Sequence, residues 1–278
     1  MEVAIIPKVQ SGFANINNAL IYYETAGNGK PFMMIHAGIA DSRQWNNEFA
    51  QFSGLFRVIR YDMRGYGKSE PVEGEFSHLQ DLTTLIEYLH LENPLILMGC
   101  SMGGSLAMDF TLMNPSKVKA LIMVDAGPSG LDLDVPTPAK FDEIEKSYNE
   151  GDLDLVAELE TQIWFDGIGR TSKQVNKKMR QLVYEMNRKG LAYDAKKLGK
   201  RLTDTKIPAA ERLTELNLPV LIIIGAYDIP YILAAAEYMV DKIPSAQKVV
   251  IQDAAHLPNL DHSREFQQVV AKFLNVTL

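Results

Sequence analysis

The chain has one cysteine, Cys100, among 278 residues, and only two tryptophans. A single cysteine cannot form a disulfide within the chain, so nothing in the sequence requires an oxidising compartment. No apolar run approaches the roughly 20 residues that a membrane-spanning helix needs. Basic residues are the minority charge, and the net charge of −7 argues against a nucleic acid as partner. The first eight residues lack the features of a signal peptide, so we expect a cytoplasmic protein.

Sequence signatures of bound cofactors are also missing. No cluster of His, Cys and carboxylate residues has the spacing of metal ligands. No glycine-rich phosphate loop or dinucleotide fingerprint follows the first strand of the expected sheet. We therefore expect neither a metal nor a cofactor. The sequence gives no indication of the oligomeric state.

Short apolar segments alternate with helical patterns along most of the chain, which is typical of a mostly parallel sheet flanked by helices. Apolar residues recur at helical spacing between these segments, for example at Leu79, Leu82 and Ile86. An N-terminal hairpin precedes the alternating part. We expect eight strands, at residues 13–16, 20–25, 32–35, 56–61, 95–98, 120–124, 220–224 and 248–251.

The alternation stops between the sixth and the seventh expected strand. This region holds helical patterns without strands, with apolar faces that begin at Phe141, Leu155 and Val175. Its first half is acidic and its second half is basic, which solvated helix faces explain better than a binding patch. We expect residues 1–128 and 214–278 to form an α/β core, and residues 129–213 to form a helical insertion that acts as a lid.

The sequence Gly-Cys-Ser-Met-Gly-Gly at residues 99–104 lies between an expected strand and an expected helix. A Gly-x-Ser-x-Gly segment in this context predicts a nucleophile elbow, a sharp turn that exposes the serine hydroxyl. The glycines on either side of Ser101 are needed because a Cβ atom there would collide with neighbouring backbone. Ser101 is therefore the candidate nucleophile. Cys100 is expected to be a buried, inert side chain, since it does not lie at the tip of the turn.

A serine nucleophile needs a base, and the base needs an acid that orients it. His256 follows the last expected strand and precedes the final helix, at the carboxyl edge of the sheet, so it is the candidate base. Asp228 follows the preceding strand and is the candidate acid. Asp125, which follows the sixth strand, is an alternative acid at the same edge.

The order Ser, Asp, His is the order found in α/β-hydrolases, and further segments resemble that family. Residues 35–39, Ile-His-Ala-Gly-Ile, are similar to the family's His-Gly loop. Residues 61–69 are similar to its Asp-x-Arg-Gly-x-Gly-x-Ser segment, in which we interpret Asp62 and Arg64 as structural. The matches cover nearly the whole chain except the insertion. The resemblance implies an α/β-hydrolase fold with its lid inserted after the sixth strand.

The resemblance also implies an oxyanion hole. Its donors would be the backbone N–H of Met102 and one from the loop after the third strand, best placed on Gly38. Because Ala37 occupies the usual glycine position, Ile39 is an alternative to Gly38. In the insertion, Trp164 and Phe165 are candidate walls of an apolar substrate pocket, although lid aromatics often pack only within the lid.

The function predicted from these residues is hydrolysis of a small to medium carboxylic ester or lactone through an acyl-enzyme on Ser101. An alternative in the same resemblance is carbon–carbon cleavage of vinylogous diketones, since that branch shares the Ser-Met-Gly-Gly elbow. A non-enzymatic alternative is a ligand receptor that kept the fold and its pocket. A serine argues against haloalkane dehalogenases and epoxide hydrolases, which use a carboxylate nucleophile.

Overall fold

The computed structural model describes residues 7–92, 94–203 and 205–277. The segment 1–6, on which much of the signal-peptide expectation rests, lies outside the described residues, as does Asn93 before the fifth expected strand. No helix in the described part of the chain is long and apolar enough to cross a membrane.

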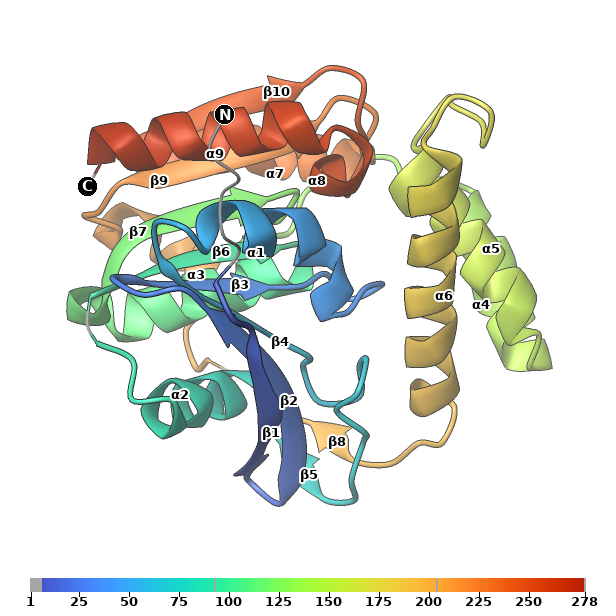
Figure 1. Ribbon diagram of the computed structural model, residues 1–278. Coiled ribbons are helices and arrows are strands. Elements are labelled where there is room, and N and C mark those ends of the chain that lie inside the picture. The colour runs from blue at the N-terminus through green and yellow to red at the C-terminus, as the bar shows by residue number, and fades with distance from the viewer. Residues whose placement is uncertain (1–6, 93, 204, 278) are drawn as a thin grey trace.

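The described residues form an eight-stranded sheet in the order β1-β2-β4-β3-β6-β7-β9-β10 (Figure 1). The pairs β1–β2 and β2–β4 are antiparallel, and all the other pairs are parallel. The predicted mostly parallel sheet of eight strands is therefore confirmed. Its strands are β1 (Gln10–Ile16), β2 (Ala19–Ala26), β3 (Pro31–Ile35), β4 (Arg57–Tyr61), β6 (Leu95–Cys100), β7 (Val118–Val124), β9 (Val220–Gly225) and β10 (Ala246–Ile251).

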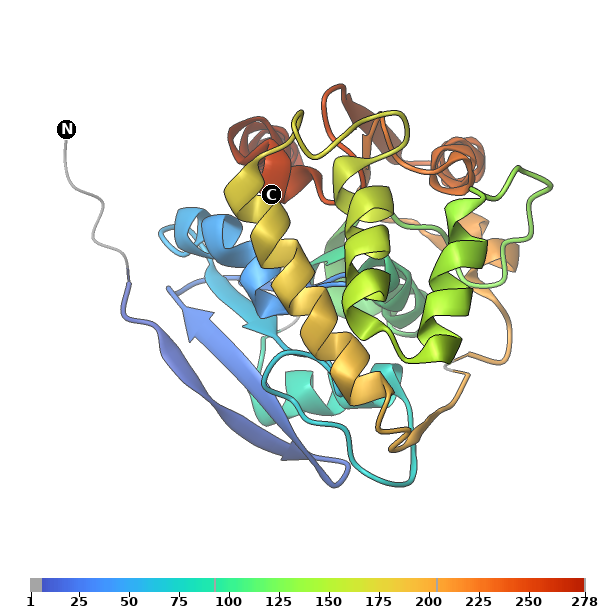
Figure 2. The ribbon, with the colours of Figure 1, turned by 90° about the vertical axis from the view of Figure 1, so that its right-hand side faces the viewer.

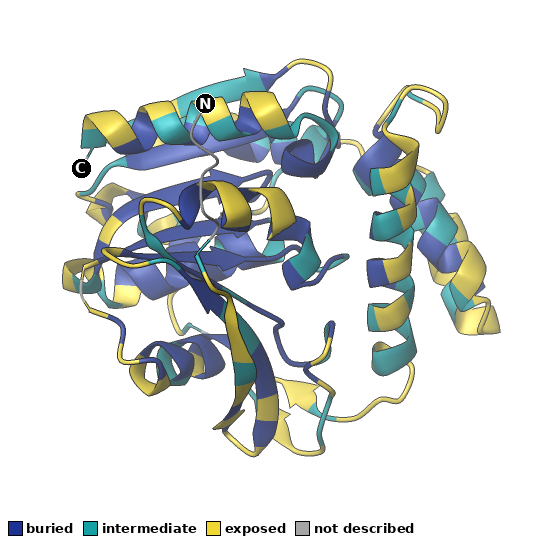
Figure 3. Cartoon of the chain, viewed as in Figure 1, coloured by how far each residue is buried: buried dark blue, intermediate teal, exposed yellow. Residues whose placement is uncertain are grey.

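The central strands are buried on both faces because helices cover both sides of the sheet (Figure 3). In β3, Met33 and Ile35 belong to one buried cluster, while Phe32 and Met34 belong to the other. The first cluster includes side chains of α2 (His78–Tyr88), α3 (Met102–Met113) and α7 (Pro230–Lys242). The second includes side chains of α1 (Asn46–Phe52) and α9 (Ser263–Thr277). Two apolar cores, one on each face, thus fix the position of the strand ends.

Between β7 and β9 the chain forms α4 (Lys140–Glu150), α5 (Leu153–Thr161), the π-helical turn η3 (Gln162–Asp166) and α6 (Lys177–Asp194). We call these elements the helical insert. They stand together beside one edge of the core (Figures 1 and 2). A Cβ atom on Gly167 would lie 2.8 Å from the Tyr227 carbonyl and 2.7 Å from the Ala255 Cβ, so the insert contacts the loops after β9 and β10. It therefore packs at the carboxyl ends of these strands.

Two short strands and a short helix were not predicted, and one of these strands, β8 (Lys200–Arg201), lies in the insertion, where no strand was expected. Strands β5 (Glu75–Phe76) and β8 pair with each other in a separate two-stranded sheet. Two residues are too few to show an alternating pattern, so neither strand has a sequence signal. Helix α8 (Pro258–Asp261) forms a single turn between His256 and α9.

Candidate active site

Ser101 lies between β6 and α3 with φ 51° and ψ −118°, a backbone conformation that L residues rarely adopt. Such a conformation costs on the order of 1–3 kcal/mol and persists only where the surroundings enforce it. Here the surroundings are close. A Cβ atom on Gly99 would lie 2.2 Å from the Gly103 carbonyl oxygen, and one on Gly103 would lie 2.5 Å from the carbonyl oxygens of Ile35 and His36. The strand and the helix can approach this closely only because both positions are glycine.

The two proposed oxyanion donors lie next to each other. Met102 is the first residue of α3, directly after Ser101. An ideal Cβ on Gly38 would lie 3.8 Å from the Met102 Cβ, so the loop after β3 touches the start of α3. That loop is fixed by the Ala40 N–H, which donates to the Ala37 carbonyl at 3.0 Å, and by the Ala37 N–H, which donates to Gln44 Oε1 at 2.8 Å. Gly38 and Ile39 are both partly exposed, and the choice between them as donor stays open.

His256 and Asp228 form a buried pair at the ends of β10 and β9. The distance between His256 Nδ1 and Asp228 Oδ2 is 2.7 Å, and each residue is 2% exposed. The other oxygen of Asp228, Oδ1, accepts the N–H of Ile229 at 2.7 Å. With Nδ1 paired to Asp228 Oδ2, Nε2 is the ring nitrogen that is left to act as a base.

Two contacts locate His256 relative to the elbow and the insert. The thiol of Cys100 donates to the His256 carbonyl at 3.5 Å, so the His256 loop packs against the end of β6. Burial raises the pKa of this thiol well above its usual value, so Cys100 stays protonated and is a poor nucleophile. From the insert, the ring of Trp164 lies 4.4 Å from the His256 ring, measured between centroids. His256 is therefore held between the core and the helical insert.

The alternative acid, Asp125, lies at the same place. One oxygen of Asp125, one of Asp228 and one ring nitrogen of His256 all lie within 4.8 Å of one another. The imidazole pairs with Asp228, while Asp125 Oδ1 accepts the N–H of Gly225 at 2.8 Å. In the described part of the chain these three residues are the only cluster with metal-ligand geometry. A cation there would have to replace the hydrogen bond between His256 and Asp228.

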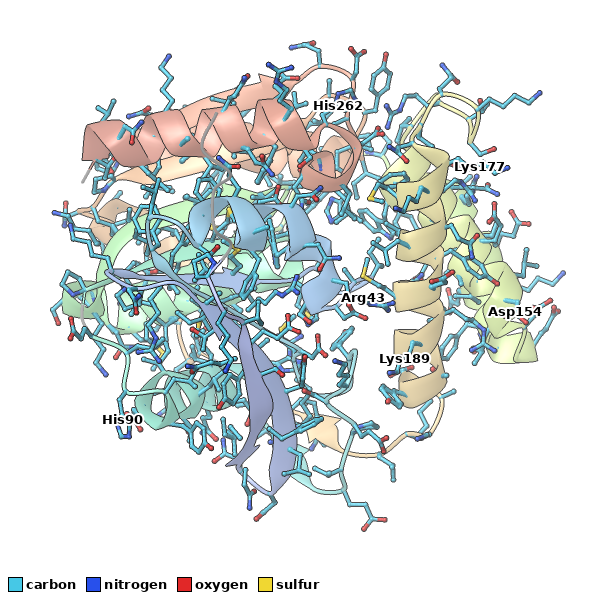
Figure 4. The ribbon with its side chains drawn as sticks, viewed as in Figure 1. Arg43, His90, Asp154, Lys177, Lys189 and His262 are labelled. Atoms are coloured by element: carbon cyan, nitrogen blue, oxygen red, sulfur yellow. The ribbon has the colours of Figure 1, made fainter. Side chains whose placement is uncertain are left out.

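Other histidines lie elsewhere or have structural partners. His36 Nε2 accepts the N–H of Met63 at 2.9 Å, and its Nδ1 lies 2.8 Å from the Ala37 carbonyl. Burial lowers the pKa of His36, which favours a neutral ring in this role. Figure 4 shows His90 beside α2, and His262 beside the start of α9, where its Nε2 lies 2.9 Å from the Asp253 carbonyl.

The segment after β4 has the bonding of a structural loop. Asp62 accepts the N–H of Ser42 at 2.8 Å and that of Lys68 at 2.7 Å. Arg64 forms two hydrogen bonds of 2.9 Å with the carboxylate of Asp81, and both side chains are buried. These contacts support the interpretation of Asp62 and Arg64 as residues that hold the loop against the sheet.

The two aromatic residues proposed for the pocket have different surroundings. Trp164 is half-buried, packs edge-on against Phe141 at 5.8 Å between ring centroids, and reaches His256. Phe165 is 1% exposed and belongs to a buried cluster with Val183 and Met186 of α6. Both residues lie in the π-helical turn η3, a kind of turn that occurs often at functional sites.

A cavity of about 320 Å³ lies beside the loop after β3. It borders Gly38 and Ile39 on the core side and Glu160 and Asn187 on the insert side. The amide of Asn187 donates to Glu160 Oε2 at 2.7 Å, and burial raises the pKa of Glu160. The sequence analysis did not select Glu160 or Asn187, because single polar residues within helical patterns have no motif that distinguishes them from surface residues.

Comparison with known proteins identifies the family. The profile of the alpha/beta hydrolase fold matches residues 30–263. The chain therefore belongs to the α/β-hydrolase fold family.

The individual proteins that match this chain have low sequence identity to it. A 2-hydroxy-6-oxononadienedioate/2-hydroxy-6-oxononatrienedioate hydrolase of Dechloromonas aromatica is 27% identical over 272 residues, which cover 91% of this chain and 90% of that protein. An uncharacterized protein of Mycobacterium tuberculosis is 33% identical over 117 residues, which cover 41% of this chain but only 34% of that protein. The crystal structure of the enol-lactonase from Burkholderia xenovorans LB400 has a TM-score of 0.76 at 20% identity, with 95% of this chain and 99% of that chain covered. The last likeness concerns the fold alone.

Proposed function

We propose that this protein is a serine hydrolase that cleaves a small to medium carboxylic ester or lactone through an acyl-enzyme on Ser101. The observation that carries the proposal is the buried pair of His256 and Asp228, 2.7 Å apart, with His256 in a loop that contacts Cys100, the residue before the elbow serine. Serine, histidine and aspartate arranged in this way have few structural uses and a well-defined chemical one.

In each half of the proposed reaction His256 acts first as a base and then as an acid. His256 Nε2 takes the proton of Ser101 Oγ, and the oxygen attacks the substrate carbonyl carbon. Backbone N–H groups of Met102 and of Gly38 or Ile39 stabilise the oxyanion. His256 then returns its proton to the leaving alcohol oxygen as the carbon–oxygen bond breaks. A water that His256 deprotonates attacks the acyl carbon. His256 then returns this proton to Ser101 Oγ as the bond between the acyl carbon and Oγ breaks, which releases the acid and restores Ser101.

The helical insert, in this proposal, is a lid that lines the substrate site. The cavity between the loop after β3 and the insert is lined by apolar side chains such as Ile39 and Tyr66 and by the polar pair of Glu160 and Asn187. Ligand sites commonly combine an apolar wall with a few polar groups in this way. We propose that one part of the substrate occupies this cavity while its carbonyl lies at Ser101.

Carbon–carbon bond hydrolysis is the second candidate function. The relative from Dechloromonas aromatica is named for such a substrate and aligns with 91% of this chain. The same triad serves either reaction, because in both a nucleophile adds to a substrate carbonyl carbon and the negative charge develops on the carbonyl oxygen. A panel of esters, lactones and vinylogous diketones separates the two functions by their kcat/KM values.

The test of the nucleophile is covalent labelling. A fluorophosphonate should form an adduct with Ser101, which mass spectrometry of the digested protein locates. The variant Ser101→Ala should not react, whereas Cys100→Ser should react like the native protein. Labelling at another residue, or no labelling of protein that circular dichroism shows to be folded, would contradict the proposal. A folded protein that binds esters without labelling or turnover would favour the receptor alternative.

A further inference from the structure

Asp125 is fixed at the end of β7, behind the proposed acid. The residue is fully buried and has a φ of 42°, which is uncommon for aspartate. Its N–H donates to the Ile223 carbonyl at 2.8 Å, and its Oδ1 accepts the N–H of Gly225 at 2.8 Å. Strand β9 therefore holds both the backbone and one carboxyl oxygen of Asp125 in place.

The second oxygen, Asp125 Oδ2, receives no hydrogen bond from any N–H or O–H group in the described ranges. A carboxyl oxygen of Asp125 lies within 4.8 Å of one of Asp228. Two ionised carboxylates cannot form a hydrogen bond with each other, since both only accept. In a buried site the two charges would also repel each other strongly. A proton on one of the two carboxyl groups removes this repulsion and supplies a donor.

The surrounding donors decide which carboxyl group is protonated. Asp228 accepts two hydrogen bonds, from the Ile229 N–H and from His256 Nδ1, and both favour its ionised form. Asp125 accepts only the Gly225 N–H. Burial, with the charge of Asp228 as a second cause, raises the pKa of Asp125 well above its usual value. The titratable groups that act on this site are Asp228, His256 and Cys100.

We propose that Asp125 is a positioning residue of the triad: a neutral carboxylic acid that donates a hydrogen bond from Oδ2 to the ionised carboxylate of Asp228. With that bond, Asp228 is held by donors on three sides, and its Oδ2 stays in line with His256 Nδ1. This inference rests on the proposed function, since it assigns Asp228 as the acid that orients His256. It also gives Asp125 a role that differs from that of a second triad acid.

Substitution of Asp125 separates these roles. In Asp125→Asn the amide oxygen can accept the Gly225 N–H, and the amide NH₂ can donate to Asp228. We expect this variant to keep kcat within roughly tenfold of the native value, because it replaces one hydrogen bond by another. Asp125→Val removes the donor at similar volume, and we expect kcat to fall by on the order of 100-fold with little change in KM. Asp228→Asn should cost ~10⁴-fold. An Asp125→Asn variant as inactive as Asp228→Asn, or a fully active Asp125→Val, would overturn the proposal.

Infrared spectroscopy tests the proton directly and needs neither turnover nor the folding of Asp125→Val. The difference spectrum of native protein minus Asp125→Asn at neutral pH should contain the carbonyl band of a protonated carboxylic acid. A carboxylate band in its place would overturn the proposal. If Ser101 fails to react with fluorophosphonate while the acid band is present, the proposed function is wrong and the hydrogen bond between the two carboxyl groups still stands.

Discussion

At the scale of single residues, the elbow depends on glycine positions, which have no Cβ atom. Gly103 faces the carbonyl oxygens of Ile35 and His36, the last residue of β3 and the first after it. A methyl group 2.5 Å from these oxygens cannot be accommodated by a side-chain rotation, because both contacts are backbone. The close approach of α3 to β3 is what brings Met102 next to Gly38.

We therefore expect Gly103→Ala to lower the free energy of unfolding by about 2 kcal/mol or more and to reduce fluorophosphonate labelling of Ser101. Gly54→Ala is a matched control, since a Cβ atom there would meet no described heavy atom within 4 Å. Its free energy of unfolding should stay within about 0.5 kcal/mol of the native value. Urea denaturation measures both variants. Equal effects at the two positions would show that crowding at Gly103 does not hold the elbow.

The sequence predicted Ser101, His256 and Asp228 as site residues, but it kept Asp125 as an alternative acid. The reason is geometric. Both aspartates follow strands that pair in parallel, β9 and β7, so both reach the same edge of the sheet. Only the side-chain bonds, with His256 on Asp228 and the Gly225 N–H on Asp125, distinguish them. These bonds depend on rotamers, which no spacing in the sequence encodes.

At the scale of helices, a buried carboxyl group joins α1, α8 and α9. Glu48 in α1 accepts hydrogen bonds from Asn259 at 3.1 Å, from Gln267 at 3.2 Å and from Ser263 at 3.3 Å. The amide of Asn259 also donates to the Gln44 carbonyl at 2.8 Å. Since Gln44 holds the loop after β3 and α8 follows His256, these contacts connect the two halves of the proposed site.

Burial raises the pKa of Glu48 from 4.5 to about 7. The folded protein thus binds this proton more tightly than the unfolded chain, and the contribution of Glu48 to stability falls as the pH rises from about 4.5 to about 7. Glu48→Gln is neutral at every pH. Relative to the native protein, we expect it to gain on the order of 3 kcal/mol in free energy of unfolding between pH 4.5 and pH 8.

Chemical denaturation of both proteins across this pH range checks the expectation. The exposed Glu145, on α4, provides a control, and Glu145→Gln should follow the native pH dependence. Parallel curves for the native protein and Glu48→Gln would mean that Glu48 is ionised in the folded state at neutral pH.

At the scale of the whole molecule, the alternation of apolar segments and helical patterns sufficed to predict the sheet. Each of the eight expected segments lies within or overlaps an observed strand. Strands such as β3, β6 and β9 are buried along their whole length and are therefore apolar throughout, whereas β1 has exposed residues. The helices of the insert were predicted by the same reasoning, applied to a region without such segments. The position of the insert on the core was not predicted, since it depends on contacts such as that of Gly167 with Tyr227 and Ala255.

Two neighbouring aromatic residues of the helical insert differ in what they contact, and we expect them to differ in their effect on substrate choice. Trp164 reaches His256, whereas Phe165 is buried among side chains that include those of α6. If Trp164 is part of the pocket wall, Trp164→Ala should change the ratio of kcat/KM between short-chain and long-chain esters, because the removed ring alters the space beside the acyl-enzyme.

Phe165 is a second candidate for the wall, but its burial favours packing. Phe165→Ala should then lower the free energy of unfolding by roughly 3–5 kcal/mol and scale all substrates together. Steady-state kinetics on an ester series, with urea denaturation of each variant, separates the two effects. A ratio that neither variant changes would mean that other residues line the pocket.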